Sequence, residues 1–216
     1  MLSFEEARVI AVMVEKAMTT PDNYPMSLNG VVTACNQVSN REPVVEFDED
    51  QVELILRALA DRGLAKMVHR PGDRVVKYRH ALDAELEVGA KELALVAVLM
   101  LRGPQTPGEL RQRTQRYVEF SSLPEVDAVL EALRHRDEPL VARQDRRPGQ
   151  KEHRYRHLLL GDVDADFDDP IDAGAQAGPR PANAEPGLRE EVNELRVEVG
   201  ELRARLESLL VELGID

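Results

Sequence analysis

The sequence Val-Glu-Leu-Ile-Leu-Arg-Ala-Leu at residues 52–59 is matched by Val-Asp-Ala-Val-Leu-Glu-Ala-Leu at residues 126–133. Both stretches place large apolar side chains at i, i+3, i+4 and i+7, the spacing of one buried helix face. Those side chains are Val52, Ile55, Leu56 and Leu59, and, each 74 residues later, Val126, Val129, Leu130 and Leu133. The pattern predicts two equivalent amphipathic helices within an internal repeat.

A predicted β-hairpin follows each helix. In the first copy an apolar run at 64–68 precedes Arg70-Pro71-Gly72-Asp73 and Lys77-Tyr78-Arg79-His80. In the second copy residues 139–144 precede Arg147-Pro148-Gly149-Gln150 and Arg154-Tyr155-Arg156-His157, at an offset of 77 residues. Pro-Gly pairs are strong turn signals. A helix followed by strand, turn and strand is the second half of a winged helix-turn-helix domain.

Capping signals place the other helices. Ser3 with Glu6, and Thr106 with Glu109, predict capping boxes at the first helix of the first copy and the second helix of the second. Asp48 with Gln51 predicts the start of the third helix, and Gly63 its end. Ser27 and Ser122 are expected to cap two further helices. The first helix of the first copy is expected to end near residue 18, and the second helix of the second copy near residue 116.

We therefore predict an α+β fold, mainly α with small β-hairpins: tandem winged helix-turn-helix domains plus a C-terminal coiled-coil helix. The predicted parts are winged-helix domains at 1–86 and 87–160, a disordered acidic linker at 161–187 and a coiled-coil helix at 188–216. The linker holds six aspartates and four prolines and too few large apolar groups to offset the entropy of ordering.

The last segment carries apolar residues at alternating spacings of four and three. Valine at two of the four a positions with leucine at each d position favours a parallel two-stranded coiled coil, which predicts a homodimer. The alternative is a single amphipathic helix packed on its own domain. The proposed dimerisation residues are Leu188, Val192, Leu195, Val199, Leu202, Leu206, Leu209 and Leu213.

The chain carries a net charge of −12, unusual for a nucleic-acid binder. The charge is uneven, however: residues 87–160 are net +2, whereas 161–187 are net −6. The single cysteine, Cys35, excludes an intramolecular disulfide. Because the amino terminus has no signal-peptide pattern and no apolar run is long enough to span a membrane, we expect a cytoplasmic protein without membrane contact.

A set of motifs in both copies is distinctive. The motifs are Glu6-Ala7-Arg8-Val9-Ile10, Glu15-Lys16, Thr19-Thr20-Pro21-Asp22, Tyr24-Pro25, Ser27-Leu28-Asn29, Ala34-Cys35-Asn36-Gln37, Arg41-Glu42-Pro43-Val44, Leu101-Arg102-Gly103, Gln105-Thr106-Pro107-Gly108-Glu109-Leu110-Arg111 and Glu119-Phe120-Ser121. Together they resemble the YceH family of bacterial proteins. The resemblance covers about residues 2–160, and it implies two tandem winged-helix domains without implying an activity. The acidic linker and the tail look like an addition to the family's common core.

Basic residues gather in the second copy, on its second helix and its hairpin. We hypothesise that they contact nucleic-acid phosphates, as in a weakly sequence-specific DNA-associated or regulatory factor. The alternative is a solvated hairpin whose arginines pair with nearby carboxylates. The candidate nucleic-acid-binding residues are Arg111, Arg113, Arg116, Arg143, Arg146, Arg147, Lys151, Arg154 and Arg156.

The third helices favour a rival function, because in DNA-binding winged helices this helix usually enters the major groove. Here both third helices are acidic, and carboxylates facing phosphates weaken binding. A protein-interaction scaffold that uses these helices and binds no nucleic acid is therefore the alternative function. The acidic side chains are Asp48, Glu49, Asp50 and Glu53 in the first copy, and Glu125, Asp127 and Glu131 in the second.

An enzyme is the least favoured class, and no catalytic residue, cofactor or metal site is predicted. His153 and His157 are four residues apart on an expected strand, without a third ligand nearby. His80 and His157 occupy equivalent places, which indicates a structural role. Cys35 lies on an apolar stripe and is interpreted as a small buried hydrophobe. The polar segments 19–25 and 36–43 could form a site, but we favour side chains there that satisfy the backbone.

Overall fold

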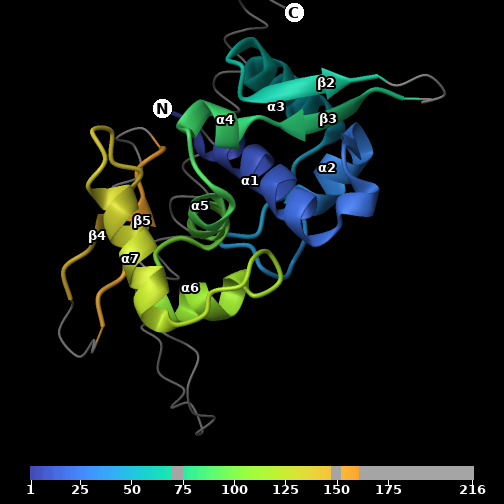
Figure 1. Ribbon diagram of the computed structural model, residues 1–216. Helices are drawn as coiled ribbons and strands as arrows, with labels where there is room; N and C mark the ends of the chain where they lie inside the picture. Colours follow the sequence, from blue (N-terminus) through green and yellow to red (C-terminus); the bar gives the residue numbers. More distant parts are fainter. Residues whose placement is uncertain (70–74, 147–151, 161–216) are drawn as a thin grey trace, which may run out of the picture. The chain divides into compact units, whose positions relative to one another are not determined.

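The computed structural model describes residues 1–69, 75–146 and 152–160, which belong to one compact unit. Within these ranges the chain is mixed α/β, with seven α-helices and small antiparallel sheets (Figure 1). The two predicted Pro-Gly turns, the acidic linker and the heptad segment all lie outside the described residues.

The first half of the repeat begins with α1 and ends with a hairpin that packs beside α3. Its strands form an antiparallel sheet in the order β1-β3-β2. The elements are α1 (Phe4–Thr19), a 3-10 turn η1 (Pro21–Asn23), β1 (Met26–Ser27), α2 (Leu28–Cys35), α3 (Glu49–Asp61), β2 (Ala65–Val68) and β3 (Lys77–His80).

The second half repeats this order, and its hairpin lies beside α7 (Figure 1). A short helix, α4 (Leu82–Leu86), leads into it. Its elements are α5 (Ala90–Arg102), α6 (Pro107–Thr114), α7 (Leu123–Arg134), β4 (Val141–Arg143) and β5 (Tyr155–His157).

The predicted caps are confirmed. Both capping boxes predicted from a Glu three residues after the cap are present, at α1 and α6. Asp48 accepts a hydrogen bond from the Gln51 amide at 2.8 Å and so caps α3. The helix α6 ends at Thr114, earlier than expected, and the buried Thr114 hydroxyl donates to the Leu110 carbonyl at 2.7 Å.

The duplication extends to a strand that the sequence did not reveal. In the first half Met26 of β1 pairs with Tyr78 of β3. In the second half Gln105 forms an isolated bridge with Tyr155 of β5. Both tyrosines are buried. In each half, therefore, the residue just before the cap of the second helix pairs with the same hairpin position.

The two halves share one hydrophobic core, because α1 packs directly on α5. The helix α5 is deeply enclosed, because it is buried continuously from Leu93 to Leu101. The periodicity of α1 predicts a single buried stripe that includes Ile10 and Val14. The structure also buries Val9 and Met13 on other sides of this helix. The additional burial arises because α1 contacts α2, α3 and α5 together.

Candidate nucleic-acid interface

The predicted basic residues of α6 have different surroundings. Arg111 is exposed and donates only a long hydrogen bond, 3.4 Å, to the Ser121 carbonyl. Arg116, just beyond the helix, is also exposed. Arg113 instead faces the Glu109 carboxylate at 4.0 Å, one helical turn away. Two of the three guanidinium groups are therefore available to a ligand, and the third is partly neutralised.

The hairpin carries Arg143 at the end of β4 and Arg146 just beyond it, and both side chains are exposed. Within the described parts of the chain neither has a carboxylate within 4 Å. Arg147 and Lys151, the two other candidates at this turn, lie outside the described residues. The described part of the hairpin thus presents two unpaired cations to solvent.

Of the remaining two candidates, Arg154 is half-buried and Arg156 is exposed. Arg154 donates through Nη1 to Glu109 Oε2 and to the Pro104 carbonyl, each at 3.0 Å. Its charge is therefore directed to the start of α6. Arg156, two residues later, lies on β5 and lines a cavity between the two halves. Arg154 is therefore less available to a phosphate than the exposed arginines, and the assignment of Arg154 and Arg156 to nucleic-acid binding stays a prediction.

The acidic residues of α7 are largely held by local partners. Glu125 pairs with Lys91 and accepts hydrogen bonds from the Ser121 amide and hydroxyl at 2.7 and 2.8 Å. These contacts, the Lys91 hydrogen bond first, lower the pKa of Glu125 to about 2. Glu131 accepts from Arg134 and from the Tyr155 hydroxyl at 2.9 Å. Two of the three acids on this helix therefore repel an approaching anion less than their sequence positions indicate.

These basic and capped elements meet at one end of the second half. Figure 1 shows three elements toward the same side: the amino end of α7, the helix α6, and the end of the hairpin at which β4 ends and β5 begins. Ser122 caps α7 by accepting from the Glu125 amide. The exposed cations Arg111, Arg116, Arg143 and Arg146 therefore come from the elements that flank the start of α7.

The equivalent surface of the first half is apolar and acidic. Leu54 on α3 is 70% exposed, and Met67 on β2 is 61% exposed. Glu53 forms an exposed ion pair with Arg57 at 2.6 Å, and Asp48 serves as the cap of α3. A large exposed leucine on this helix was not identified from the sequence, because the pattern alone marks only the buried face.

A buried ion pair of the first half accepts a hydrogen bond from the second half. Arg41, in the loop after α2, is 4% exposed, and Glu15 of α1 is 6% exposed. The guanidinium contacts both carboxylate oxygens, at 3.3 Å and 2.5 Å. Tyr117, which follows α6 in the second half, donates to Glu15 Oε1 at 3.1 Å. Burial, together with the neighbouring Glu15 carboxylate, raises the pKa of Tyr117 and keeps its hydroxyl protonated.

The motif-dense polar loop at 36–43 is held together internally. Asn36 donates to the Phe47 carbonyl at 2.7 Å and accepts from the Phe47 amide at 2.8 Å. Arg41 also donates to the carbonyls of Ala34 and Asn40. The prediction that Asn36 and Arg41 satisfy the backbone is thus confirmed. The ion pair between Arg41 and Glu15 was not predicted, since the two residues lie 26 positions apart in the sequence.

Cys35 and the histidines at the strand ends have structural surroundings. Cys35 is fully buried, and burial raises the pKa of its thiol to about 12 despite the nearby guanidinium groups of Arg8 and Arg41. This confirms its interpretation as a small buried hydrophobe. His80 and His157 are the last residues of β3 and β5, as expected from their equivalent places in the repeat.

No helix in the ranges 1–69, 75–146 and 152–160 has the length and apolar character required to cross a membrane. In the same part of the chain, no group of three or more His, Cys, Asp and Glu side chains is arranged to hold a metal ion.

Comparison with known proteins identifies the family. A family profile described as "Protein of unknown function, DUF480" matches residues 2–150. A UPF0502 protein from Klebsiella pneumoniae is 46% identical over 218 residues, covering 99% of this chain and 98% of that protein. The UPF0502 protein YceH of Salmonella newport is 45% identical with the same coverage.

These relatives also correct one expectation. Because the alignments cover 99% of this chain, they include the segment after residue 160, so that segment is shared with the relatives rather than added to them. The family profile and the nearly full-length similarity together show that the chain belongs to the YceH family, whose shared domain is DUF480.

Proposed function

We propose that this chain is a non-enzymatic binding protein with two tandem winged-helix modules, the second of which contacts the phosphate backbone of DNA. The observation that carries the proposal is the set of exposed arginines without a carboxylate partner in the described part of the second half. They are Arg111, Arg116, Arg143, Arg146 and Arg156.

The order of elements supports the winged-helix assignment. Each half contains a helix, a short strand or bridge, two further helices and an antiparallel hairpin. In proteins that bind DNA through this arrangement, the third helix approaches the major groove and the hairpin reaches the backbone or the minor groove. The exposed cations lie on the second helix and on the hairpin, which are positions suited to phosphate contacts.

The chemistry of α7 favours contacts to the backbone over reading of bases. Its exposed positions include Leu123, Pro124 and Ala128, none of which can donate a hydrogen bond from its side chain. Arg134, in its last turn, is engaged with Glu131. Base-specific contacts in the major groove usually come from Arg, Lys, Asn or Gln. Binding should therefore be weakly sequence-specific and strongly dependent on salt.

The test is a titration of random duplex DNA at several salt concentrations with the full chain and two double variants. The first, Arg143→Ser with Arg146→Ser, removes two unpaired cations of the second half. The charge-matched control, Arg57→Ser with Arg79→Ser, removes two exposed arginines of the first half. Each lost phosphate contact should reduce the slope of log K against log salt by about 0.9. The slope of the first variant should therefore be smaller than that of the unaltered protein by up to about 1.8.

The control variant should keep the slope of the unaltered protein. No binding by the unaltered chain at about 50 mM salt, or an equal loss of slope in both variants, would exclude the second half as the phosphate-contacting surface.

A second candidate function rests on the first half, which we propose as a protein-docking surface. Leu54 and Met67 are both large apolar side chains more than half exposed on the elements that form a contact face in winged helices. In capture experiments from extracts of the native cell, the double variant Leu54→Ser with Met67→Ser should no longer retain protein partners that the unaltered chain retains. The same loss is expected in nuclease-treated extracts. Retention of every such partner by this variant would exclude the docking role.

The proposed homodimer through residues 188–216 would place two copies of the basic surface on one duplex and raise the avidity for DNA. These residues lie outside the described part of the chain, and the heptad pattern alone supports the proposal. Light scattering at tens of micromolar should give the mass of a dimer. A monomeric mass would refute it.

A further inference from the structure

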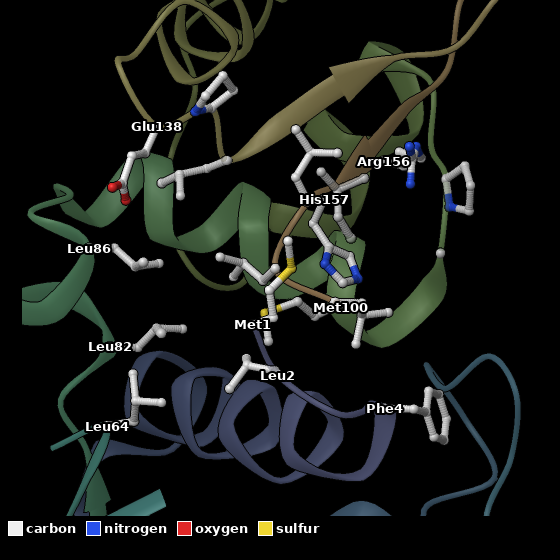
Figure 2. Close-up of a pocket in the computed structure, with 18 of the residues that line it drawn as sticks. Met1, Leu2, Phe4, Leu64, Leu82, Leu86, Met100, Glu138, Arg156 and His157 are labelled. Atoms are coloured by element: carbon white, nitrogen blue, oxygen red, sulfur yellow. The ribbon is translucent and has the colours of Figure 1, made fainter. Parts of the chain in front are cut away.

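A cavity of about 770 Å³ lies between the two halves, and both halves contribute to its lining (Figure 2). Its walls come from the start of α1, from α4 and α5, and from the hairpin of the second half. This volume lies within the range of sites that bind small organic molecules. The apolar part of the lining includes Leu2, Leu64, Leu82, Leu99, Met100 and Leu140.

Hydrogen bonds between the halves hold the walls of this cavity in place. The amide of Leu2, at the start of the chain, donates to the Leu159 carbonyl at 2.7 Å. Arg136, which follows α7 in the second half, donates to the carbonyl of Leu86, the last residue of α4, at 2.7 Å. Leu2, Leu86 and Leu159 all line the cavity. The segments that surround the space are therefore fixed to one another.

Water is a poor occupant of the apolar interior. An ordered water needs polar partners, usually two to four of them, and leucine side chains provide none. Leu86 and Leu160 line the cavity and are only partly buried. A ligand that covers these two side chains removes apolar surface from water, and the hydrophobic effect favours its binding.

The acidic and basic residues of the lining lie at its margin. Those in the described part of the chain are all exposed, and they carry both signs of charge. One of them, Arg62, already pairs with the Glu6 carboxylate at 2.7 Å. Figure 2 shows the Glu138 carboxylate directed away from the apolar side chains. The margin thus favours neither an anion nor a cation. Its acidic and basic residues are Glu42, Arg62, Glu85, Glu138 and Arg156.

We propose that this cavity binds a small uncharged molecule with an apolar body. The body of the ligand lies among the leucines, and a hydroxyl or similar polar group lies at the margin beside solvent. Because the lining comes from both halves, the bound molecule stabilises the folded arrangement of α1, α4 and the second hairpin, and it raises the melting temperature. This site is independent of the proposed contacts with DNA and with a protein partner.

The probe is N-phenyl-1-naphthylamine, which is uncharged near pH 7 and becomes fluorescent in apolar sites. The full chain should show saturable binding at one site per chain, and decan-1-ol should displace the probe. Decanoate and decyltrimethylammonium have the same chain length with a negative or a positive charge. Each should compete about tenfold more weakly, because its charge loses hydration at the cavity without gaining a partner. At about 100 times its Kd, decan-1-ol should raise the melting temperature by roughly 5–11 °C.

One variant localises the site, and a matched variant serves as its control. Leu86→Trp, at a partly buried position of the cavity wall, should fill the space and abolish probe binding. Leu123→Trp is the control, because it introduces the same side chain at an exposed leucine of α7 that does not line the cavity. The probe is excited at a wavelength that indole does not absorb. The double variant Glu85→Gln with Glu138→Gln should keep the affinity of the unaltered chain, since the charges at the margin do not hold the ligand.

The absence of saturable binding to the unaltered chain would overturn the proposal. Equal binding by Leu86→Trp and Leu123→Trp would also overturn it, because the probe would then lie elsewhere. Stronger competition by decanoate or decyltrimethylammonium than by decan-1-ol would exclude an uncharged ligand. If circular dichroism shows that Leu86→Trp does not fold, the smaller change Leu86→Phe should weaken probe binding relative to Leu123→Phe, and equal affinities of these two variants would refute the location.

Discussion

Replacing Arg41 with alanine should destabilise the protein strongly, because it leaves a carboxylate buried without its cation. Glu15 is 6% exposed and would keep the Tyr117 hydroxyl at 3.1 Å and Lys16 at 3.7 Å. The Ala34 carbonyl would also lose two donors. Removing one partner of a buried ion pair costs about 3–5 kcal/mol. At about 2–4 °C per kcal/mol for a chain of this size, the melting temperature should fall by roughly 6–20 °C.

The exposed pair between Arg57 and Glu53 provides the control. Their nitrogen and oxygen are 2.6 Å apart, but the two side chains are 64% and 37% exposed. Such a pair contributes about 0–1 kcal/mol, so Arg57→Ala should hardly change the free energy of unfolding. Urea unfolding followed by circular dichroism measures both variants. A loss below about 1 kcal/mol for Arg41→Ala, equal to that of the control, would refute the reasoning.

The same network predicts coupling between Arg41 and Glu15. Replacing both by apolar residues removes the uncompensated charge, so the double variant should be less destabilised than the two single variants added together. Tyr117→Phe should cost about 1–2 kcal/mol, since it removes one hydrogen bond to a charged group. If the loss in free energy of unfolding of the double variant equals the sum of the two single losses, Arg41 and Glu15 do not act as a pair.

Three further predictions concern the second half and the tail. Folding lowers the pKa of His157 from 6.5 to about 4, so the unfolded chain takes up a proton first as the pH falls. The stability that comes from keeping His157 neutral in the folded protein is present above pH 6.5 and is lost as the pH falls toward 4. Between pH 7.5 and 5.5 the free energy of unfolding of the unaltered protein should fall by about 1 kcal/mol more than that of the His157→Asn variant, as measured by urea unfolding. Thr106→Ala removes the cap of α6, a 3.2 Å bond from the Glu109 amide, and should cost about 1 kcal/mol in the same assay. Deletion of residues 188–216 should convert the proposed dimer into a monomer, measured by light scattering.

Local signals predicted the helices and hairpins because their causes lie within a few residues. The apolar spacing at 52–59 and the box formed by Thr106 and Glu109 act within one or two helical turns. The two-residue strand β1 could not be predicted, because it exists only through pairing with Tyr78, which is 52 residues away from Met26 in the register. The helix α4 has five residues and no side-chain cap, so no start signal marks it in the sequence.

The candidate site was predicted less well than the fold, because charge neutralisation depends on tertiary contacts. Arg113 follows Glu109 by four residues, a spacing that signals a pair on a helix and could have been used. Arg154 reaches the same carboxylate from 45 residues away, and no local signal indicates this contact. Similarly, the apolar pattern of α1 identified one buried face, and the burial of Val9 depends on packing that involves the second half.

Comparison of equivalent positions separates what the two halves share from what distinguishes them. Met67 pairs with Tyr78, and Arg143 pairs with Tyr155, so these two exposed side chains occupy the same place in their hairpins. Exchanging them, Met67→Arg with Arg143→Met, changes neither the composition nor the net charge. If a guanidinium contacts DNA only in the second half, the exchanged protein should bind duplex DNA as weakly as Arg143→Ser. Binding equal to that of the unaltered chain would show that total charge governs the affinity, and not the surface beside α7.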